Sequence, residues 1–261
     1  MGKQAAMAKL VAKRRAESGG RYHHLHLYDG GSWDLDFVVP WTKSACYLDA
    51  DLMIIGQDWA SEDYLRRNND AKQRADRAVT GQDAHLATNQ NLKRLLTLHF
   101  GLCFSRTYAT NVLVYIKPGG MSSKVPKKDL TRCATAYTLP ELEIVKPRMA
   151  LCLGAVTFDS VRSALGLGRL GWQDACIPSA HTRSGPTEIY GVPHTGSWGT
   201  KNAGGPQAVD AIWATLARRF HVLAGSARES FAVIDVDRCV GTKSAQARSA
   251  RIAFFKNARL C

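Results

Sequence analysis

The sequence predicts an α/β fold, a single-domain α/β/α sandwich around a mostly parallel central sheet. Short apolar runs alternate along the chain with longer segments of helical periodicity. Each apolar run ends in a glycine or polar turn, which is typical of parallel strands covered by helices on both faces. With 261 residues and 45% hydrophobic side chains, the chain can bury a sizeable core.

The elements follow from this alternation. Strands are expected at 51–55, 107–115, 148–154 and 188–194. Helices are expected at 62–80, which could instead be mobile, and at 89–99, 127–145, 155–165 and 206–220. Residues 3–16 could form a basic helix or a frayed tail. We therefore divide the chain into a basic N-terminal extension (1–45), the α/β domain (46–222) and a basic C-terminal extension (223–261).

Charge and composition narrow the class of partner. The formal net charge of +13 indicates a polyanionic partner, most simply nucleic acid. No apolar run approaches the roughly 20 residues of a membrane span, and the N-terminus has no signal-peptide core. The seven cysteines are scattered singly, unlike a disulfide framework. We expect a cytoplasmic protein, associated with the nucleoid of a bacterium or with a phage, that acts as a monomer.

Each of the four predicted strands has a polar residue or a glycine in it or directly after it. Gln57 and Asp58 come after the first, Asn111 lies on the second, Gly154 ends the third and His194 ends the fourth. Ligands of parallel α/β sheets bind at the carboxyl ends of the strands, so these residues should share one crevice. An amide, a carboxylate, an imidazole and a glycine turn before a helix could read a base and a phosphate.

Four motifs in this order resemble the uracil-DNA glycosylase superfamily. "GQDWA" looks like its first motif, GQDPYH, and "TNVLVY" looks like the strand that carries a base-reading Asn. "KPRMALCLGAVTFDSV" is similar to the strand and turn before a phosphate-contacting helix, and "VPHTGSWG" is similar to the closing His motif, HPSPLS. The resemblance covers roughly residues 50–220 and implies hydrolysis of the bond between a base and deoxyribose.

The resemblance assigns a role to each site residue. Asp58 would orient water and stabilise the sugar cation, and His194 would stabilise the departing anionic base. Gln57 would border the base, and Asn111 would bind its edge. The alternatives are ordinary structural roles: a helix-capping Asp58, an exposed Gln57, a strand-end Asn111 bonded to local backbone and a structural His194.

The same resemblance predicts the path of the DNA. Gly154 and Ala155 would hold a phosphate at a helix N-terminus, or form an ordinary βα turn. Trp198, beside Ser197, falls where the family has a leucine that wedges into the duplex, although it could simply be a partly buried surface residue. The loop after the second strand supplies the remaining predicted DNA contacts, unless it is only a solvated loop: Lys117, Ser122, Ser123 and Lys124.

The sequence departs from the iron–sulfur branch of the superfamily, which the segment "CATAYTLPELEIVKPR" otherwise resembles. That branch needs four cysteines, two of them in a C-x-x-C that is missing here. Cys133 matches the last ligand, but Tyr115 stands where the preceding ligand would be. We therefore expect no cluster and no other cofactor. A metal site at His23, His24 and His26 is also not expected, because no matched ligands follow.

Ala60 is the second departure. In GQDPYH the aligned Tyr shuts out bases with a substituent at C5, whereas Ala60 could leave this wall open. The leading hypothesis is a monofunctional DNA glycosylase for uracil or a C5-modified pyrimidine. Its role could be DNA repair or antiviral defence against phage with modified cytosines. The alternatives are a non-catalytic nucleic-acid-binding protein on the same fold and an RNA- or nucleotide-processing hydrolase.

Overall fold

A five-stranded sheet forms the centre of the computed structural model, which describes residues 1–83, 85–223 and 225. Its strands lie in the order β2-β1-β3-β5-β4. Four of them pair in parallel, and the edge strand β4 pairs antiparallel with β5. Their bounds are β1 Leu52–Asp58, β2 Tyr108–Leu113, β3 Met149–Leu153, β4 His181–Ser184 and β5 Thr187–Val192. The α/β class predicted from the sequence is confirmed.

β1 runs further than the sequence suggested. Its first four residues, Leu52 to Ile55, are apolar and fully buried, as expected. The strand then continues through Gly56 to Asp58, with Gly56 paired to Asn111 of β2 and Asp58 paired to Leu113. Gln57 and Asp58 therefore belong to the end of a hydrogen-bonded strand and not to a turn after Gly56.

The order of the strands creates a switch point beside β1. The chain passes from β1 to β2 on one side and later to β3 on the other, and β1 pairs with both. Loops that leave the carboxyl ends of β1 and β3 therefore diverge to opposite sides. In open α/β sheets a ligand crevice forms at such a point.

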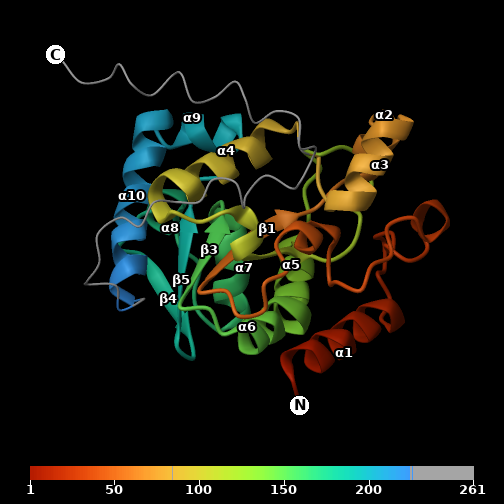
Figure 1. The fold of residues 1–261 in the computed structure, drawn as a ribbon, viewed down its shortest axis with the longest axis horizontal. Helices are drawn as coiled ribbons and strands as arrows, with labels where there is room; N and C mark the ends of the chain where they lie inside the picture. The colour runs from red at the N-terminus through yellow and green to blue at the C-terminus, as the bar shows by residue number, and fades with distance from the viewer. Residues whose placement is uncertain (84, 224, 226–261) are drawn as a thin grey trace, which may run out of the picture. The chain divides into compact units, whose positions relative to one another are not determined.

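One side of the sheet is covered by α5 (Lys127–Cys133), η5 (Ala134–Thr138), α6 (Leu139–Val145) and α7 (Ala155–Ala164). α7 packs against the four parallel strands through buried residues that include Phe158 and Val161. The single helix predicted at 127–145 exists, but its middle turn is π-helical. Figure 1 shows α1 (Lys3–Ala16) next to α6.

A second group of helices contains α4 (Ala87–Leu95), its π-helical continuation η3 (Leu96–Phe100), α9 (Ser197–Asn202) and α10 (Pro206–Leu223) (Figure 1). Phe100 and Trp213 hold η3 against α10, with ring centroids 5.9 Å apart. No helix of the described part of the chain is long and apolar enough to cross a membrane.

The predicted helix 62–80 is two helices, α2 (Glu62–Arg67) and α3 (Ala71–Thr80). Each has its own N-cap: the Ser61 side chain accepts from the Tyr64 N–H, and the Asp70 side chain accepts from the Gln73 N–H. The remaining elements are α8 (Trp172–Ala175) and the short turns η1 (Tyr28–Gly31), η2 (Pro40–Ser44) and η4 (Phe104–Arg106).

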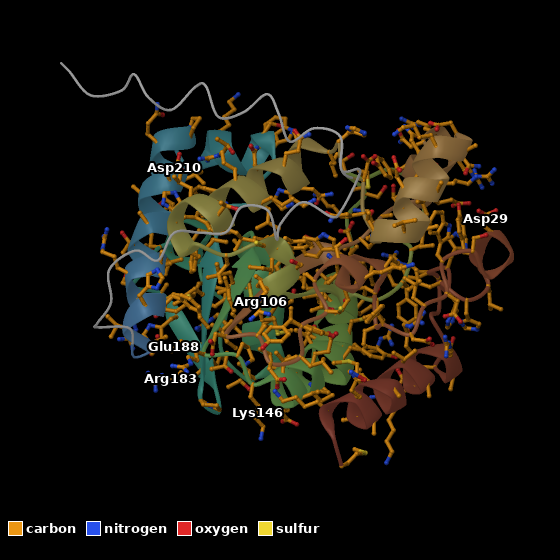
Figure 2. All side chains as sticks on the ribbon, in the orientation of Figure 1. Asp29, Arg106, Lys146, Arg183, Glu188 and Asp210 are labelled. Atoms are coloured by element: carbon orange, nitrogen blue, oxygen red, sulfur yellow. The ribbon has the colours of Figure 1, made fainter. Side chains whose placement is uncertain are left out.

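β4 was missed by the sequence analysis because its residues, HTRS, include no apolar run. A buried carboxylate ties it to its neighbours. Glu188 of β5 pairs with Arg183 of β4 and with Arg219 of α10, whose Nε lies 2.9 Å from the carboxylate (Figure 2). These partners, led by Arg219, lower the pKa of Glu188 to about 2.

The first 45 residues, predicted as an extension, contribute to the same core as the sheet. Met7, Leu10 and Val11 of α1 are buried in it, as are Val38 and Trp41. All described residues belong to one compact unit that spans Met1–Glu229. The C-terminal extension predicted at 223–261 lies almost wholly outside the described residues, so its boundary stays a prediction.

Candidate active site

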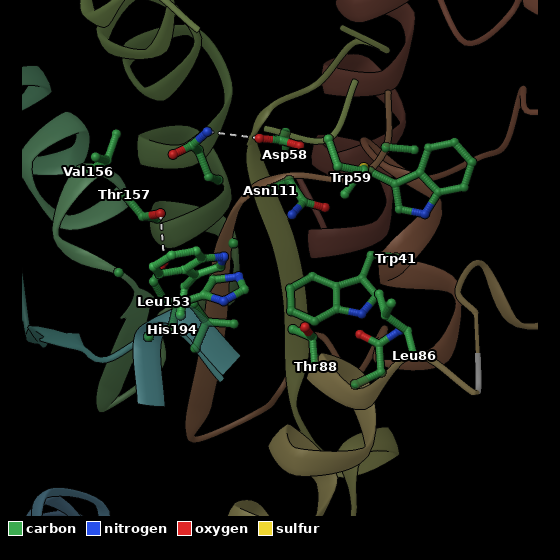
Figure 3. A pocket seen from close by; sticks show the side chains of 18 of the residues that line it. Trp41, Asp58, Trp59, Leu86, Thr88, Asn111, Leu153, Val156, Thr157 and His194 are labelled. Atoms are coloured by element: carbon green, nitrogen blue, oxygen red, sulfur yellow. Dashed lines mark hydrogen bonds between the residues drawn. The ribbon is translucent and has the colours of Figure 1, made fainter. Parts of the chain in front are cut away.

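A cavity of about 450 Å³ opens at the carboxyl ends of β1, β2, β3 and β5. Eight of the residues proposed from the sequence line it: Gln57, Asp58, Ala60, Asn111, Gly154, Ala155, His194 and Trp198. In Figure 3, His194 and Leu153 lie on one side, Trp41, Trp59 and Leu86 lie on the other, and Asn111 and Asp58 lie between them. The volume is within the range of small-molecule pockets.

Asp58 is held by two neighbours at the end of β1. The Gln57 side-chain amide donates to Oδ2 at 2.8 Å, as the dashed line in Figure 3 shows. The Lys117 ammonium lies 3.0 Å from Oδ1 and 3.2 Å from Oδ2. Both carboxylate oxygens therefore have partners, and the group has one fixed orientation towards the cavity.

Lys117 corrects a prediction. We expected it to contact the DNA backbone, with a solvated loop as the alternative, but its side chain is only 3% exposed. Its ammonium also donates to the Met121 carbonyl at 2.6 Å. Because a buried ammonium needs a charged partner, Lys117 is an internal counter-ion of Asp58 and not a surface contact.

Asn111 is buried beside β1, and Gly56 makes room for it. A Cβ at Gly56 would stand 2.4 Å from Asn111 Nδ2 and 3.3 Å from the Trp41 ring, so no larger residue fits there. Asn111 Oδ1 is buried and has no partner among the described residues. A buried, unpaired amide oxygen is costly unless a ligand pairs with it.

His194 lines the cavity and is exposed to it. Desolvation by the surrounding protein lowers the pKa of the imidazole, and the opposing effect of the Asp58 charge is smaller. The Gly196 N–H lies 3.1 Å from Nδ1 and donates to it. Nδ1 is therefore an acceptor, and the neutral ring carries its proton on Nε2.

Gly154 connects β3 to α7 with a backbone that other residues rarely adopt. Its φ is +93°, and a Cβ there would lie 3.8 Å from the His194 Cβ. α7 starts at the next residue, so Ala155 and Val156 lie at the edge of the cavity with the free N–H groups of the helix.

The sequence model of the uracil DNA glycosylase superfamily matches residues 43–217. This range covers most of the chain and all four strands that surround the cavity. The chain belongs to the uracil DNA glycosylase superfamily. Membership implies a hydrolase that removes a base from DNA. A comparison with curated proteins found no significant match.

Tyr115 and Cys133, which the resemblance aligns with cluster ligands of the iron–sulfur branch, are both buried among other side chains. Tyr22 stacks on Tyr115 with ring centroids 6.3 Å apart, and the Tyr115 and Tyr137 hydroxyls are 3.5 Å apart. His24 packs edge-on against Tyr115. Burial raises the pKa of the Cys133 thiol, which disfavours the thiolate that binds iron. These residues do not fit a cluster.

The remaining predicted DNA contacts lie outside the deep part of the cavity. Trp198 is 73% exposed at the start of α9, with the Lys201 ammonium 5.6 Å from its ring centroid. Ser197 next to it is exposed as well. On the loop after β2, Ser122 and Lys124 are exposed and Ser123 is half-buried, and none of the three lines the cavity.

Several cavity residues were missed by the sequence analysis. Trp41 is 7% exposed and lies against Gly56, where its ring forms one wall. Arg77 and Gln82 come from α3 and the loop after it. Trp172 of α8 is 44% exposed at the rim. The segments that carry these residues had no periodic signal that pointed to a ligand.

Proposed function

We propose that the protein is a monofunctional DNA glycosylase that hydrolyses the N-glycosidic bond of uracil or of a C5-substituted pyrimidine and leaves an abasic site. The observation that carries this proposal is the unpaired, buried Oδ1 of Asn111 in a cavity that Asp58 and His194 also line. The substrate would be DNA in the cytoplasm, bound by a monomer. A modified cytosine of phage DNA is one such base, and its removal would serve antiviral defence.

Base recognition follows from the walls of the cavity. A nucleotide flipped out of the DNA would insert its base between the Trp41 side and the His194 side. The Asn111 amide can donate and accept hydrogen bonds side by side, which matches the edge of a pyrimidine. Gly56 allows Asn111 to reach this position, and Ala155 at the start of α7 lies where a DNA phosphate could be bound.

The chemistry divides charge between two sides of the cavity. As the C1′–N bond breaks, its electron pair leaves with the base and positive charge develops on the sugar. The Nε2–H of the neutral His194 would donate to the base oxygen on which negative charge develops. The Asp58 carboxylate, fixed by Lys117 and Gln57, would stabilise the sugar cation and orient the water that attacks C1′. The water that attacks C1′ releases one proton to solvent and the departing base anion takes one up, so the net reaction is hydrolysis.

Ala60 supports the extension to C5-substituted bases. It follows β1 by two residues, lines the cavity and is 2% exposed. Its neighbour Trp59 packs against the same hydrophobic cluster and donates its indole N–H to the Gly81 carbonyl at 2.8 Å. Position 60 itself carries only a methyl group, where the family motif has a tyrosine.

A panel of labelled oligonucleotides tests the proposal. It should contain uracil, hypoxanthine, thymine, hydroxymethylcytosine and glucosylated hydroxymethylcytosine, and alkaline cleavage after incubation reports abasic sites. We expect excision of at least one pyrimidine and none of hypoxanthine. If no base is released although the DNA is bound, the protein is a non-catalytic binder on this fold and the proposal is wrong.

Ala60→Tyr tests the wall at C5 separately. The added ring should suppress excision of any C5-substituted base that the wild type accepts, because a packed turn leaves it no room to withdraw. Excision of uracil should survive better. The ratio of the two rates is the measurement, because losses of folding or of DNA affinity cancel in it. An unchanged ratio would show that Ala60 does not lie at the C5 edge of the base.

A further inference from the structure

A second part of the cavity lies beyond the residues assigned to the base. Its wall is formed by Trp59, Tyr64, Arg77, Gln82 and Asp83, which we call the α3 compartment. The Trp59 bond to the Gly81 carbonyl fixes the end of β1 against the loop after α3. The Tyr64 hydroxyl of α2 donates to Asp83 Oδ2 at 2.8 Å. These two bonds hold the compartment in one shape.

The α3 compartment contains buried polar atoms that have no partner. Arg77 is 3% exposed, and both of its terminal nitrogens, NH1 and NH2, lack a hydrogen-bond acceptor among the described residues. Gln82 is 4% exposed, and its Oε1 lacks a donor. Buried polar groups are nearly always paired, so these atoms point to a ligand. Asn111 Oδ1, the proposed base reader, has the same property in the first part of the cavity.

Arg77 has no ion-pair partner in the part of the chain that the structure describes, and its position is fixed by other contacts. Its Nε donates to the Gln73 carbonyl at 3.2 Å. Its guanidinium lies 5.6 Å from the Trp33 ring centroid and 5.9 Å from that of Tyr64. The two aromatic rings therefore hold the guanidinium while its terminal N–H groups remain unused. A guanidinium held in this way is prepared for an acceptor that the protein itself does not supply.

The mixed character of the wall selects the ligand chemistry. Arg77 offers donors, whereas Gln82 Oε1 and the Asp83 carboxylate offer acceptors. A phosphate or carboxylate would pair with Arg77 but would also face the oxygens of Gln82 and Asp83. A hydroxyl group can accept from Arg77 and donate its one hydrogen to Gln82 Oε1, the acceptor that lacks a donor, and the rings of Trp59 and Tyr64 provide apolar faces for the carbon atoms that carry it.

We propose that the α3 compartment binds a neutral, hydroxyl-bearing substituent on C5 of the flipped pyrimidine, and that Arg77 and Gln82 determine this specificity. The proposal rests on the proposed glycosylase function. The small side chain of Ala60 would leave the passage from the base to the compartment open. A hydroxymethyl group and a hexose attached to it share this chemistry.

The test uses Arg77→Met and Gln82→Met, which remove the unpaired polar atoms; Met matches Gln in length and is shorter than Arg. Arg74→Met is the matched control, because Arg74 lies on the same helix and is exposed. Single-turnover rates should be measured on oligonucleotides with uracil, hydroxymethylcytosine, glucosylated hydroxymethylcytosine and carboxycytosine. We expect the wild type to excise a hydroxyl-bearing base, and each cavity variant to lose on the order of tenfold or more on that base. Arg74→Met should match the wild type.

Thermal unfolding separates this role from a structural one. Because the unpaired Oε1 is a cost in the ligand-free protein, Gln82→Met should have a Tm equal to or above that of the wild type. Arg77→Met also loses the Nε bond to the Gln73 carbonyl, so the Tm test rests on Gln82→Met. A lower Tm of Gln82→Met, with an equal loss on every base in both variants, would assign both residues to the fold and overturn the proposal.

The base panel distinguishes the remaining outcomes. Preference for hydroxymethylcytosine over its glucosylated form would identify a small substituent, and the reverse preference would identify a hexose. Excision of uracil alone would refute the α3 compartment and leave the glycosylase function standing. Preference for carboxycytosine would refute the neutral ligand. If no base is excised, it is the proposed function that fails.

Discussion

Asp58, Asn111 and His194 are each oriented by a different neighbour. Lys117 and Gln57 hold the carboxylate, Gly56 makes room for the amide, and the Gly196 N–H sets the tautomer of the imidazole. These contacts fix the orientation of each group before any substrate arrives. Preorganised groups need not reorient as charge develops in the transition state, which is the main source of electrostatic catalysis.

Asp58→Asn should reduce the single-turnover rate by about 10² to 10³ while DNA affinity stays within a few-fold, because the substitution removes charge and little volume. Rates are measured on the best substrate of the oligonucleotide panel, and affinity is measured by fluorescence anisotropy. Asp36→Asn is the control, since that side chain is 96% exposed. A fully active Asp58→Asn protein would contradict the proposed role.

Lys117→Met should impair excision and also stability. It leaves the buried Asp58 carboxylate with Gln57 alone, and removal of one partner of a buried ion pair costs about 3–5 kcal/mol. The salt dependence of DNA binding should not change, because Lys117 is buried and paired with Asp58. If Lys117→Met reduced the salt dependence of DNA binding and left the Tm unchanged, Lys117 would contact the DNA backbone as first predicted.

The pH dependence of catalysis should report His194. Desolvation by the surrounding protein holds the pKa of its imidazole below the ordinary value, so the ring is neutral at neutral pH. As pH falls through that lowered pKa, a proton on Nδ1 would face the Gly196 N–H, and the rate should fall. In His194→Gln, whose amide does not titrate, the rate should be lower and this acid limb should disappear. An identical acid limb in both proteins would show that another group titrates.

Between elements, a buried carboxyl joins α6 to β2. Glu141 of α6 is fully buried. It accepts hydrogen bonds from the Tyr108 hydroxyl at 2.6 Å and from the Thr110 hydroxyl at 2.9 Å. Burial raises the pKa of Glu141 to about 8, and the two hydrogen bonds oppose this shift only partly. The helix therefore packs on the sheet through a carboxyl that is protonated at neutral pH.

Glu141 makes stability depend on pH in a definite direction. The unfolded carboxyl titrates near 4.5 and the folded one near 8, so the folded state binds more protons between these values. Its contribution is fully present below 4.5 and is lost as pH rises through about 8, by a few kcal/mol in order of magnitude. Glu141→Gln can keep both hydrogen bonds, so its unfolding free energy should fall less across this window.

Urea unfolding at several pH values provides the measurement. Glu143→Gln is the matched control, because Glu143 lies on the same helix and is exposed. It should follow the wild-type curve. Parallel curves for wild type and Glu141→Gln would show that Glu141 is ionised in the folded protein throughout.

The whole molecule carries a net charge of +13, which should make DNA binding depend strongly on salt. Each phosphate contact with duplex DNA contributes about −0.9 to the slope of log affinity against log salt concentration. Lys124→Met should lower the magnitude of the slope by about 1, because Lys124 is exposed on the loop after β2. Lys9→Met on α1 should leave it unchanged. Affinity that does not vary between low and moderate salt would refute the electrostatic argument.

The sequence by itself determined the α/β class, the four parallel strands and the residues at their carboxyl ends. Apolar runs of strand length end at Gly56 and Gly154 and are separated by segments of helical periodicity. These patterns are local, so they can be read without knowing the tertiary structure. Gln57, Asp58, Asn111 and His194 could therefore be expected in one crevice, and they line one cavity. The short polar strand β4 had no such signal.

Only the tertiary structure decided how the other residues meet these four. Lys117 reaches Asp58 across 59 positions of sequence and is buried there, although its loop reads as solvent-exposed. Trp41 and Arg77 come to the cavity from segments with no ligand-binding pattern. The physical reason is that periodicity specifies which face of an element is buried, whereas the path of a loop depends on the side chains that pack beneath it. Where a loop returns to the sheet is therefore a property of the folded chain.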